Sequence, residues 1–244
     1  MTKILANDGI SQAGIDALTE KGFEVITEKV AQEDLINIIN TENYEVLLVR
    51  SATTVRKDLI DACPHLKVVG RGGVGMDNID VDYARKKGIN VINTPAASSA
   101  SVAELVFAHL FGMVRFLFDS NRQMPMTGDA DFKSLKKSYA NGRELAGKTL
   151  GIIGFGRIGQ EVAKRAIGLG MKVIAHDKFI EEVNITLDFF NGDKKSFTIE
   201  TESLKEVLSN SDFITLHIPK IGDKAVVGAE EIGMMKTGAG IVNA

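Results

Sequence analysis

Three glycines stand at a spacing that could bind the phosphates of a dinucleotide. Gly154, Gly156 and Gly159 follow the apolar run Leu150 to Ile153 and open a segment with helical periodicity. In such a strand, turn and helix, the first glycine permits the tight turn, the second lets a pyrophosphate approach the backbone, and the third lets the helix pack on the strand. The free amides and positive dipole end of the helix would complete an anion site. The pattern predicts a nicotinamide dinucleotide site.

An acidic residue follows at the distance that ribose recognition requires. Asp177 ends the next apolar segment, Lys172 to Ala175, and lies 23 residues after Gly154, close to the roughly 20 typical of this motif. Its carboxylate can accept a hydrogen bond from the 2′-hydroxyl of NAD and would repel the 2′-phosphate of NADP. The sequence therefore favours NAD, against the weaker alternative that the glycines only make turns and Asp177 only ends a strand.

A second glycine-rich loop could recognise a small anion. Residues 71–80 read RGGVGMDNID and follow a strand pattern, which places three glycines at the carboxyl end of a strand. Ligands bind at that edge of open α/β sheets, and consecutive glycine amides can converge on an anion. Arg71 and Arg50 are both expected at this edge, where arginine can hold a carboxylate or phosphate through two bonds. A tight turn with solvated arginines is the alternative.

The elements that must position these residues alternate strand and helix, which predicts parallel sheets covered by helices. The expected strands of the first half are Lys3–Ala6, Glu24–Thr27, Val46–Val49, Lys67–Val69 and Asn90–Ile92. The expected helices between them are Ile10–Lys21, Gln32–Asn40, Lys57–Ala62 and Val81–Lys87. After the glycine motif, a capping box at Ser203–Glu206 predicts a helix start. A strand at Phe213–His217, a helix at Glu230–Lys236 and a strand at Ile241–Asn243 follow.

A domain boundary is expected near residue 98, which gives domains 1–98 and 99–244. Pro95 and the small residues after it suit a hinge. The segment Val102 to Phe118 predicts a helix that is apolar on more than one side, to be covered by a second subunit in a homodimer or higher homo-oligomer, or within one chain. Arg122 to Arg143 has little periodicity and predicts an extended connection or arm. No helix covers the last strand before Ala244, so the second domain is expected to be incomplete.

The composition is typical of a soluble globular protein, with 44% hydrophobic and 25% charged residues and a net charge of −3. This charge gives no reason to expect a nucleic-acid or acidic-membrane partner. No apolar run approaches the roughly 18 residues of a membrane span, and no signal peptide is apparent, so a cytoplasmic location is expected. Cys63 is the sole cysteine and predicts an inert thiol. The sequence has no His, Asp or Glu cluster at the spacing of metal ligands, so no metal site is expected.

Several ordered motifs make the chain resemble the D-isomer-specific 2-hydroxyacid dehydrogenases. They are VRSAT at Val49–Thr53, the loop RGGVGMDNID, NTP and SVAEL within Asn93–Leu105, ELAGKTLGIIGFGRIG at residues 144–159, and DFITLHIP at Asp212–Pro219. The resemblance covers essentially the whole chain. It implies two α/β domains with parallel Rossmann-like or flavodoxin-like sheets, in which the NAD-binding domain is inserted into a discontinuous substrate domain.

Residue by residue, the resemblance assigns substrate contacts to the first half. Arg50 and Arg71 would hold a phosphate or carboxylate, and the backbone amides around Val74 and Gly75 would hold the substrate carboxylate. Many relatives carry Gly-Asn where this chain has Ala97 and Ser98. Ser98 would therefore offer at best a hydroxyl in place of an amide.

The cofactor contacts implied by the resemblance lie in the second half. They are Gly154, Gly156, Arg157, Ile158, Gly159, Asp177, Ile218, Pro219 and Ala244. Arg157 and Ile158 would lie on the pyrophosphate, Asp177 on the adenosine ribose, and Ile218 with Pro219 beside the nucleotide.

The catalytic residues of the family would lie beyond Ala244. Relatives follow the IVNA strand with a small residue and an arginine, and place a glutamate and a histidine further on. In the family the histidine, polarised by the glutamate, takes the hydroxyl proton as hydride leaves for the nicotinamide, while the arginine orients the substrate. None of the four histidines here has the motif to substitute, and His217 is expected to be structural. These 244 residues alone are therefore expected to be inactive in hydride transfer.

The implied activity is NAD-dependent oxidation of a small acidic 2-hydroxyacid. The VRSAT and RGGVGMDN forms of the motifs favour 3-phospho-D-glycerate, oxidised to 3-phosphohydroxypyruvate in serine biosynthesis. Reduction of glyoxylate or hydroxypyruvate on the same scaffold is one alternative. A non-catalytic regulator that binds NAD(H) is another.

Overall fold

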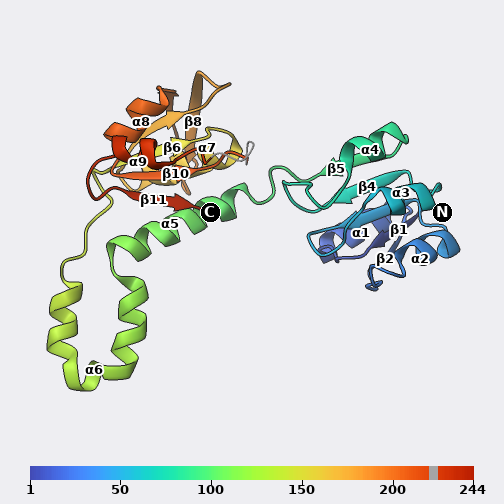
Figure 1. Ribbon diagram of the computed structural model, residues 1–244, viewed down its shortest axis with the longest axis horizontal. Coiled ribbons are helices and arrows are strands. Elements are labelled where there is room, and N and C mark those ends of the chain that lie inside the picture. Colours follow the sequence, from blue (N-terminus) through green and yellow to red (C-terminus); the bar gives the residue numbers. More distant parts are fainter. Residues whose placement is uncertain (220–224) are drawn as a thin grey trace. The chain divides into compact units, whose positions relative to one another are not determined.

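The computed structural model describes residues 1–219 and 225–244, which divide into two compact units, Met1–Ser98 and Ser99–Ala244 (Figure 1). Each unit is built on its own parallel sheet with helices between the strands. The predicted α/β fold class with parallel sheets is confirmed.

The first unit has the strand order β2-β1-β3-β4-β5, all parallel, which is the order of flavodoxin-like folds. Its strands are β1 Lys3–Ala6, β2 Glu24–Ile26, β3 Val46–Val49, β4 Val68–Arg71 and β5 Asn90–Asn93. Its helices are α1 Gln12–Glu20, α2 Leu35–Glu42, α3 Lys57–Ala62 and α4 Val81–Lys86. The predicted elements are present. Lys3–Ala6, Val46–Val49 and Lys57–Ala62 have the predicted ends, the other elements have shifted ends, and Arg71 belongs to the strand instead of the loop.

The helices of the first unit cover its sheet unevenly. Leu35 and Ile39 of α2 and Leu59 of α3 are buried in one core cluster with Leu47 and Val69 of the sheet. The right-handed crossover rule places α1, which joins β1 to β2, on the opposite face. No residue of α1 is buried. That second face therefore stays partly open.

The second unit has a four-stranded parallel sheet in the order β11-β10-β6-β7. The strands of this sheet are β6 Thr149–Ile153, β7 Lys172–His176, β10 Phe213–Leu216 and β11 Gly240–Asn243, and the unit also contains the separate strands β8 Glu182–Asp188 and β9 Lys194–Glu200. Its helices are α5 Ser99–Val114, α6 Leu117–Tyr139, α7 Arg157–Gly168, α8 Leu204–Asn210 and α9 Ala229–Met234. The predicted capping box begins α8: the amide of Glu206 donates to Ser203 Oγ, and the Ser203 amide donates to the Glu206 carboxylate.

The segment from Arg122 to Arg143 is mostly helical, so the predicted extended connection is wrong. Helix α6 follows α5 after Phe116, whose φ of 52° ends α5 earlier than expected. Asp131 interrupts α6 with non-helical angles, and Figure 1 shows two segments of α6 running back along each other. No residue of α6 is buried, and its apolar side chains Leu117, Phe118, Met126 and Phe132 are exposed.

A two-stranded antiparallel hairpin, β8 and β9, lies between β7 and α8 and was not anticipated. Val183, Ile185 and Ile199 pack against the core of the unit. The turn contains Asn191 followed by Gly192, whose φ is 88°. An Asn-Gly turn between alternating apolar residues is a hairpin signal that the sequence did contain.

Within the described part of the chain, no single helix is long and apolar enough to cross a membrane. Helices α5 and α6 meet the length and composition criteria only as a pair, with a bend of 59° between them.

Candidate functional site

The three glycines of the turn after β6 are required for different reasons. Gly154 has a φ of 95°, and a Cβ added there would lie 2.6 Å from the carbonyl oxygen of His217. A Cβ on Gly159 would overlap the carbonyl of Gly154, so this glycine brings α7 close to the turn. A Cβ on Gly156 would meet nothing within 4 Å. The chain itself therefore does not require the second glycine, and the backbone there is open to a ligand.

This turn lies where the strand order of the sheet reverses. From β6 the chain passes to β7 on one side and later to β10 on the other, and ligands bind at such switch points in α/β sheets. Ile218 and Pro219 follow β10, and Ile218 is in contact range of the Gly154 position. Ala244 follows β11, at the same edge of the parallel sheet.

Three other residues assigned to the cofactor, Gly156, Arg157 and Ile158, lie at the start of α7. Gly156 is its N-cap and Arg157 its first residue. The side chain of Arg157 is exposed, whereas Ile158 is half-buried and packs on the core. The helix thus presents a cation and free backbone amides at its positive end.

Asp177 follows β7 and is more heavily bonded than the sequence suggests. Its Oδ2 accepts a hydrogen bond from the Phe155 amide at 2.7 Å, and its Oδ1 accepts from the amides of Phe179 at 2.8 Å and Ile180 at 3.2 Å. A carboxylate has about four acceptor positions, so a ribose hydroxyl can still be accommodated. Asp177 therefore also braces the glycine turn, a role that motif spacing alone does not reveal.

His217 lies beside this turn as a neutral side chain. Burial lowers its pKa to about 4, and its Nε2 lies 2.9 Å from Oγ1 of the buried Thr215. At neutral pH it carries no charge. Its backbone carbonyl is the group that closes over Gly154.

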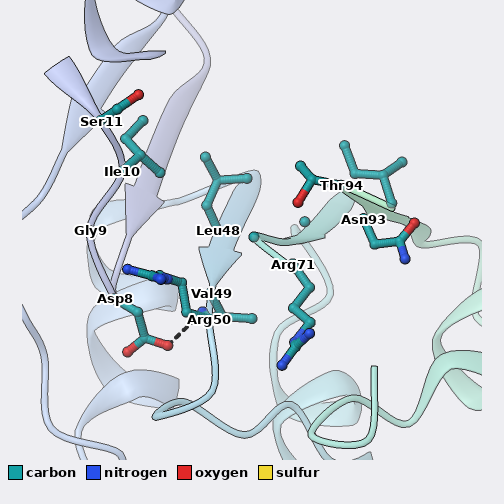
Figure 2. Close-up of a pocket in the computed structure, with 13 residues that line it drawn as sticks. Asp8, Gly9, Ile10, Ser11, Leu48, Val49, Arg50, Arg71, Asn93 and Thr94 are labelled. Atoms are coloured by element: carbon teal, nitrogen blue, oxygen red, sulfur yellow. Dashed lines mark hydrogen bonds between the residues drawn. The ribbon is translucent and has the colours of Figure 1, made fainter. Parts of the chain in front are cut away.

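The two arginines of the first unit lie at one sheet edge, but their side chains differ in direction. Arg50 follows β3 and Arg71 ends the adjacent strand β4. Figure 2 shows Arg50 turned toward Asp8 and Gly9, while Arg71 points away from them. Neither has an ion pair within the described part of the chain, and Nε of Arg71 is buried without a hydrogen-bond partner.

The glycine loop after β4 makes room for Arg71 and leaves amides exposed. A Cβ on Gly73 would overlap the guanidinium of Arg71. The Thr94 amide donates to the carbonyl of Gly73 at 3.2 Å, and Asn93 Nδ2 donates to that of Val74 at 2.7 Å. Among the described residues, no acceptor is bonded to the amides of Val74 or Gly75. These are the two amides assigned to the substrate carboxylate.

Two neighbouring cavities open at this edge. The larger, of about 660 Å³, is lined by Asp8, Gly9, Ile10, Ser11, Leu48, Val49, Arg50, Gly70, Arg71, Gly72, Ile92, Asn93 and Thr94 (Figure 2). The smaller, of about 460 Å³, shares Asp8, Gly9 and Arg50 and adds Lys29. Lys29 follows β2 in an irregular segment, where no periodicity could single it out. The second cavity is therefore bordered by two cations.

A polar network behind Arg50 was also missed by the sequence analysis. Asp8 accepts hydrogen bonds from the amides of Arg50 at 2.7 Å and Thr53 at 3.1 Å, and from Thr53 Oγ1 at 2.8 Å. Burial would raise the pKa of Asp8, but these bonds outweigh it and hold the pKa below its usual value. Asn78 Nδ2 donates to the carbonyls of Arg50 at 2.7 Å and Thr53 at 2.6 Å. The available signal was a set of polar residues directly after strand patterns.

Other predicted features lie apart from these sites. Ser98 is the last residue of the first unit and lines neither cavity. Cys63 is fully buried, which raises the pKa of its thiol and disfavours the reactive thiolate. Within residues 1–219 and 225–244, no three His, Cys, Asp or Glu side chains gather as metal ligands would.

Comparison with known proteins places the whole chain in one group. The profile described as D-isomer specific 2-hydroxyacid dehydrogenase, catalytic domain, matches residues 4–218. The chain is 39% identical to a hydroxypyruvate reductase of Thermotoga maritima, covering 99% of this chain and 73% of that protein. It is 40% identical to a D-3-phosphoglycerate dehydrogenase of Methanocaldococcus jannaschii, covering 100% of this chain but only 44% of that protein.

Solved structures agree with this grouping. NAD+-bound 3-phosphoglycerate dehydrogenase of Entamoeba histolytica matches with a TM-score of 0.72 and 28% identity, over 99% of this chain and 71% of that one. An acyclic imino acid reductase in complex with NADPH and D-Arg matches with a TM-score of 0.72 and 27% identity, over 99% and 74%. The chain belongs to the D-isomer specific 2-hydroxyacid dehydrogenase family.

Proposed function

We propose that this chain carries the substrate-recognition and cofactor-binding parts of an NAD-dependent dehydrogenase that oxidises 3-phospho-D-glycerate to 3-phosphohydroxypyruvate, in cytoplasmic serine biosynthesis. Residues 1–98 would form the first part of the substrate domain and residues 99–244 the NAD-binding domain. The observation that carries the substrate is that three cations, Lys29, Arg50 and Arg71, line two adjoining cavities and have no ion pair within the described residues. A ligand with both a carboxylate and a phosphate suits such a group.

The residues present fit a dinucleotide. Gly156 leaves the backbone open where a Cβ would intrude, and α7 directs free amides toward the same place. Asp177 favours NAD over NADP because its charge would repel a 2′-phosphate. Bound NAD would accept the hydride from the substrate carbon, while the residues of this chain bind and orient both ligands.

Equilibrium binding tests this proposal without requiring turnover. Calorimetric titration of the 244-residue chain should show NADH bound at least about tenfold more tightly than NADPH, a difference of about 1.4 kcal/mol. An Asp177→Ala substitution should narrow that ratio. Arg71→Ala should weaken 3-phospho-D-glycerate binding and leave NADH binding unchanged. If Arg71→Ala and the wild type bind 3-phospho-D-glycerate with equal affinity, the proposed substrate is wrong.

Reduction of hydroxypyruvate or glyoxylate is the second candidate. It is favoured by the Thermotoga maritima relative, of which the chain covers 73%. These acids lack a phosphate, so Lys29→Ala should not affect their binding, whereas it should weaken 3-phospho-D-glycerate binding. A non-catalytic NAD(H)-binding regulator would bind NADH but none of these three acids.

A homodimer that covers α5 and α6 is also part of the proposal. Val106 and Leu110 of α5 are buried within the unit, while Leu105, Phe111 and Met113 are exposed. Helix α6 adds further exposed apolar side chains, namely Leu117, Phe118, Met126 and Phe132. Exposed apolar side chains gathered into a patch are typical of interaction surfaces, and we propose that a second copy of this chain covers them.

A further inference from the structure

The backbone of Arg50 is held from both sides by side chains of other loops. Its amide donates to Asp8 Oδ2 at 2.7 Å, and its carbonyl accepts from Asn78 Nδ2 at 2.7 Å. Asp8 follows β1 and Asn78 lies in the loop after β4, so the two strands that flank β3 both contribute. The Arg50 side chain itself stays exposed and lines both cavities.

The same two residues also fix the end of the loop that Arg50 begins. Thr53 is 2% exposed; its amide and hydroxyl donate to Asp8, and its carbonyl accepts from Asn78. Asn7 Nδ2 donates to Thr53 Oγ1 at 2.9 Å and closes the network. Residues 50–53 are therefore clamped at both ends, and the side chain that projects from the clamped segment toward Asp8 and Gly9 is that of Arg50 (Figure 2).

The negative charge of Asp8 is unfavourable beside an anion site, but an asparagine amide could not make the hydrogen bonds that the Asp8 carboxylate makes. A carboxylate beside a bound anion repels it. An asparagine would avoid this repulsion, yet only one of its two terminal atoms can accept, whereas both oxygens of Asp8 accept hydrogen bonds. The carboxylate is thus needed for its two acceptors.

We propose that Asp8 and Asn78 are positioning residues that direct the Arg50 guanidinium toward the anionic group of the substrate. This inference rests on the proposed function, because it takes Arg50 as a contact of an acidic ligand. Asp8 and Asn78 act through the backbone of Arg50 and need not touch the ligand.

The test is a double-mutant cycle on the 244-residue chain, with 3-phospho-D-glycerate and inorganic phosphate as probes. Affinity is measured for the wild type, Asp8→Asn, Arg50→Ala and the double variant. Asp8→Asn should weaken binding about tenfold, as expected when charge-assisted hydrogen bonds at a site are lost. In the double variant the Asp8 substitution should add nothing to Arg50→Ala, because its effect passes through that side chain.

Asp61→Asn is the matched control. Asp61 is another carboxylate of the same unit whose hydrogen bonds, from Lys87 and Tyr83, lower its pKa, and it lines neither cavity. It should leave probe affinity unchanged. If Asp8→Asn fails to fold, Asn78→Ala removes the bond to the Arg50 carbonyl and should show the same non-additivity with Arg50→Ala.

The outcomes separate the inference from the function it rests on. Additive losses, or tighter probe binding by Asp8→Asn, would overturn the positioning role, since removal of a negative charge alone strengthens anion binding. If Arg50→Ala itself binds both probes as the wild type does, the proposed substrate site is wrong. If Arg50→Ala weakens binding and Asp8→Asn does not, only the positioning role fails.

Discussion

A Gly156→Ala substitution should separate cofactor binding from folding. Gly156 has φ −71° and ψ −160°, which alanine can adopt, and its added Cβ would meet nothing within 4 Å. Loss of a glycine N-cap destabilises a helix by up to about 1 kcal/mol. The alanine also restricts the unfolded chain, which stabilises the folded state by about 0.4–1 kcal/mol. The two effects nearly cancel. The melting temperature should therefore change by no more than about 3 °C.

Cofactor affinity should respond very differently. In the proposed site, the Cβ would stand where we expect the pyrophosphate to approach the backbone, and a lost hydrogen bond to a charged group is worth about 1.5–3 kcal/mol. NADH affinity should fall about tenfold to a hundredfold. The assay is NADH fluorescence titration, paired with thermal unfolding of each variant.

Two other glycines of α7 provide the comparison. Gly168→Ala, at the end of the helix, also meets nothing within 4 Å and should alter neither NADH affinity nor the fold. Gly159→Ala should destabilise the unit by about 3 kcal/mol through overlap with the carbonyl of Gly154. Unchanged NADH affinity in a folded Gly156→Ala variant would refute the assignment of this turn to the pyrophosphate.

Three further predictions concern stability and assembly. The pKa of His217 is lowered from 6.5 to about 4, so the folded unit resists protonation of this side chain. Up to about 3 kcal/mol of stability should therefore be lost as the pH falls from about 6.5 to about 4. Urea unfolding across this range should show a smaller dependence of stability on pH for His217→Gln, and an identical dependence in the two proteins contradicts the prediction. Ser203→Ala should lower the free energy of unfolding by about 1 kcal/mol, whereas the exposed Ser209→Ala should have little effect. Combined Phe118→Asp and Met126→Asp substitutions should reduce the mass measured by light scattering from dimer to monomer, and a monomeric wild type would disprove the dimer.

Most elements that the sequence predicted bury part of an apolar face, although α1 and α9 were predicted and bury no residue. The strands of both sheets and helices such as α7 bury an apolar face against a core, and burial is what imposes periodicity on a sequence. Helix α6 buries no residue, and the polar composition of residues 122–143 led to the wrong prediction of an extended chain. The hairpin β8–β9 did leave a signal, in the alternation around Ile185 and the turn at Gly192.

In the candidate site, the residues that belong to a motif of fixed spacing were predicted, and those that lie far apart in the sequence were not. The glycines at 154, 156 and 159 and Asp177 could be found because a fixed backbone geometry imposes fixed spacing. Asp8, Asn78 and Lys29 were not found, because they lie after three different strands and the distances between them along the chain follow no motif; their places after strand patterns were the only signal. Arg71 was found by its motif, but its seat against Gly73 emerges only from the folded loop.

The bonds that Asp177 makes to the chain have an evolutionary consequence. One carboxylate both selects the ribose of the cofactor, in our proposal, and anchors the Phe155 amide within the glycine turn. A mutation that removes the charge to admit a phosphorylated ribose would at the same time loosen the turn to which our proposal assigns the pyrophosphate. Coenzyme preference and coenzyme affinity are therefore coupled traits, and a lineage that changes the first must acquire a second substitution to restore the anchor.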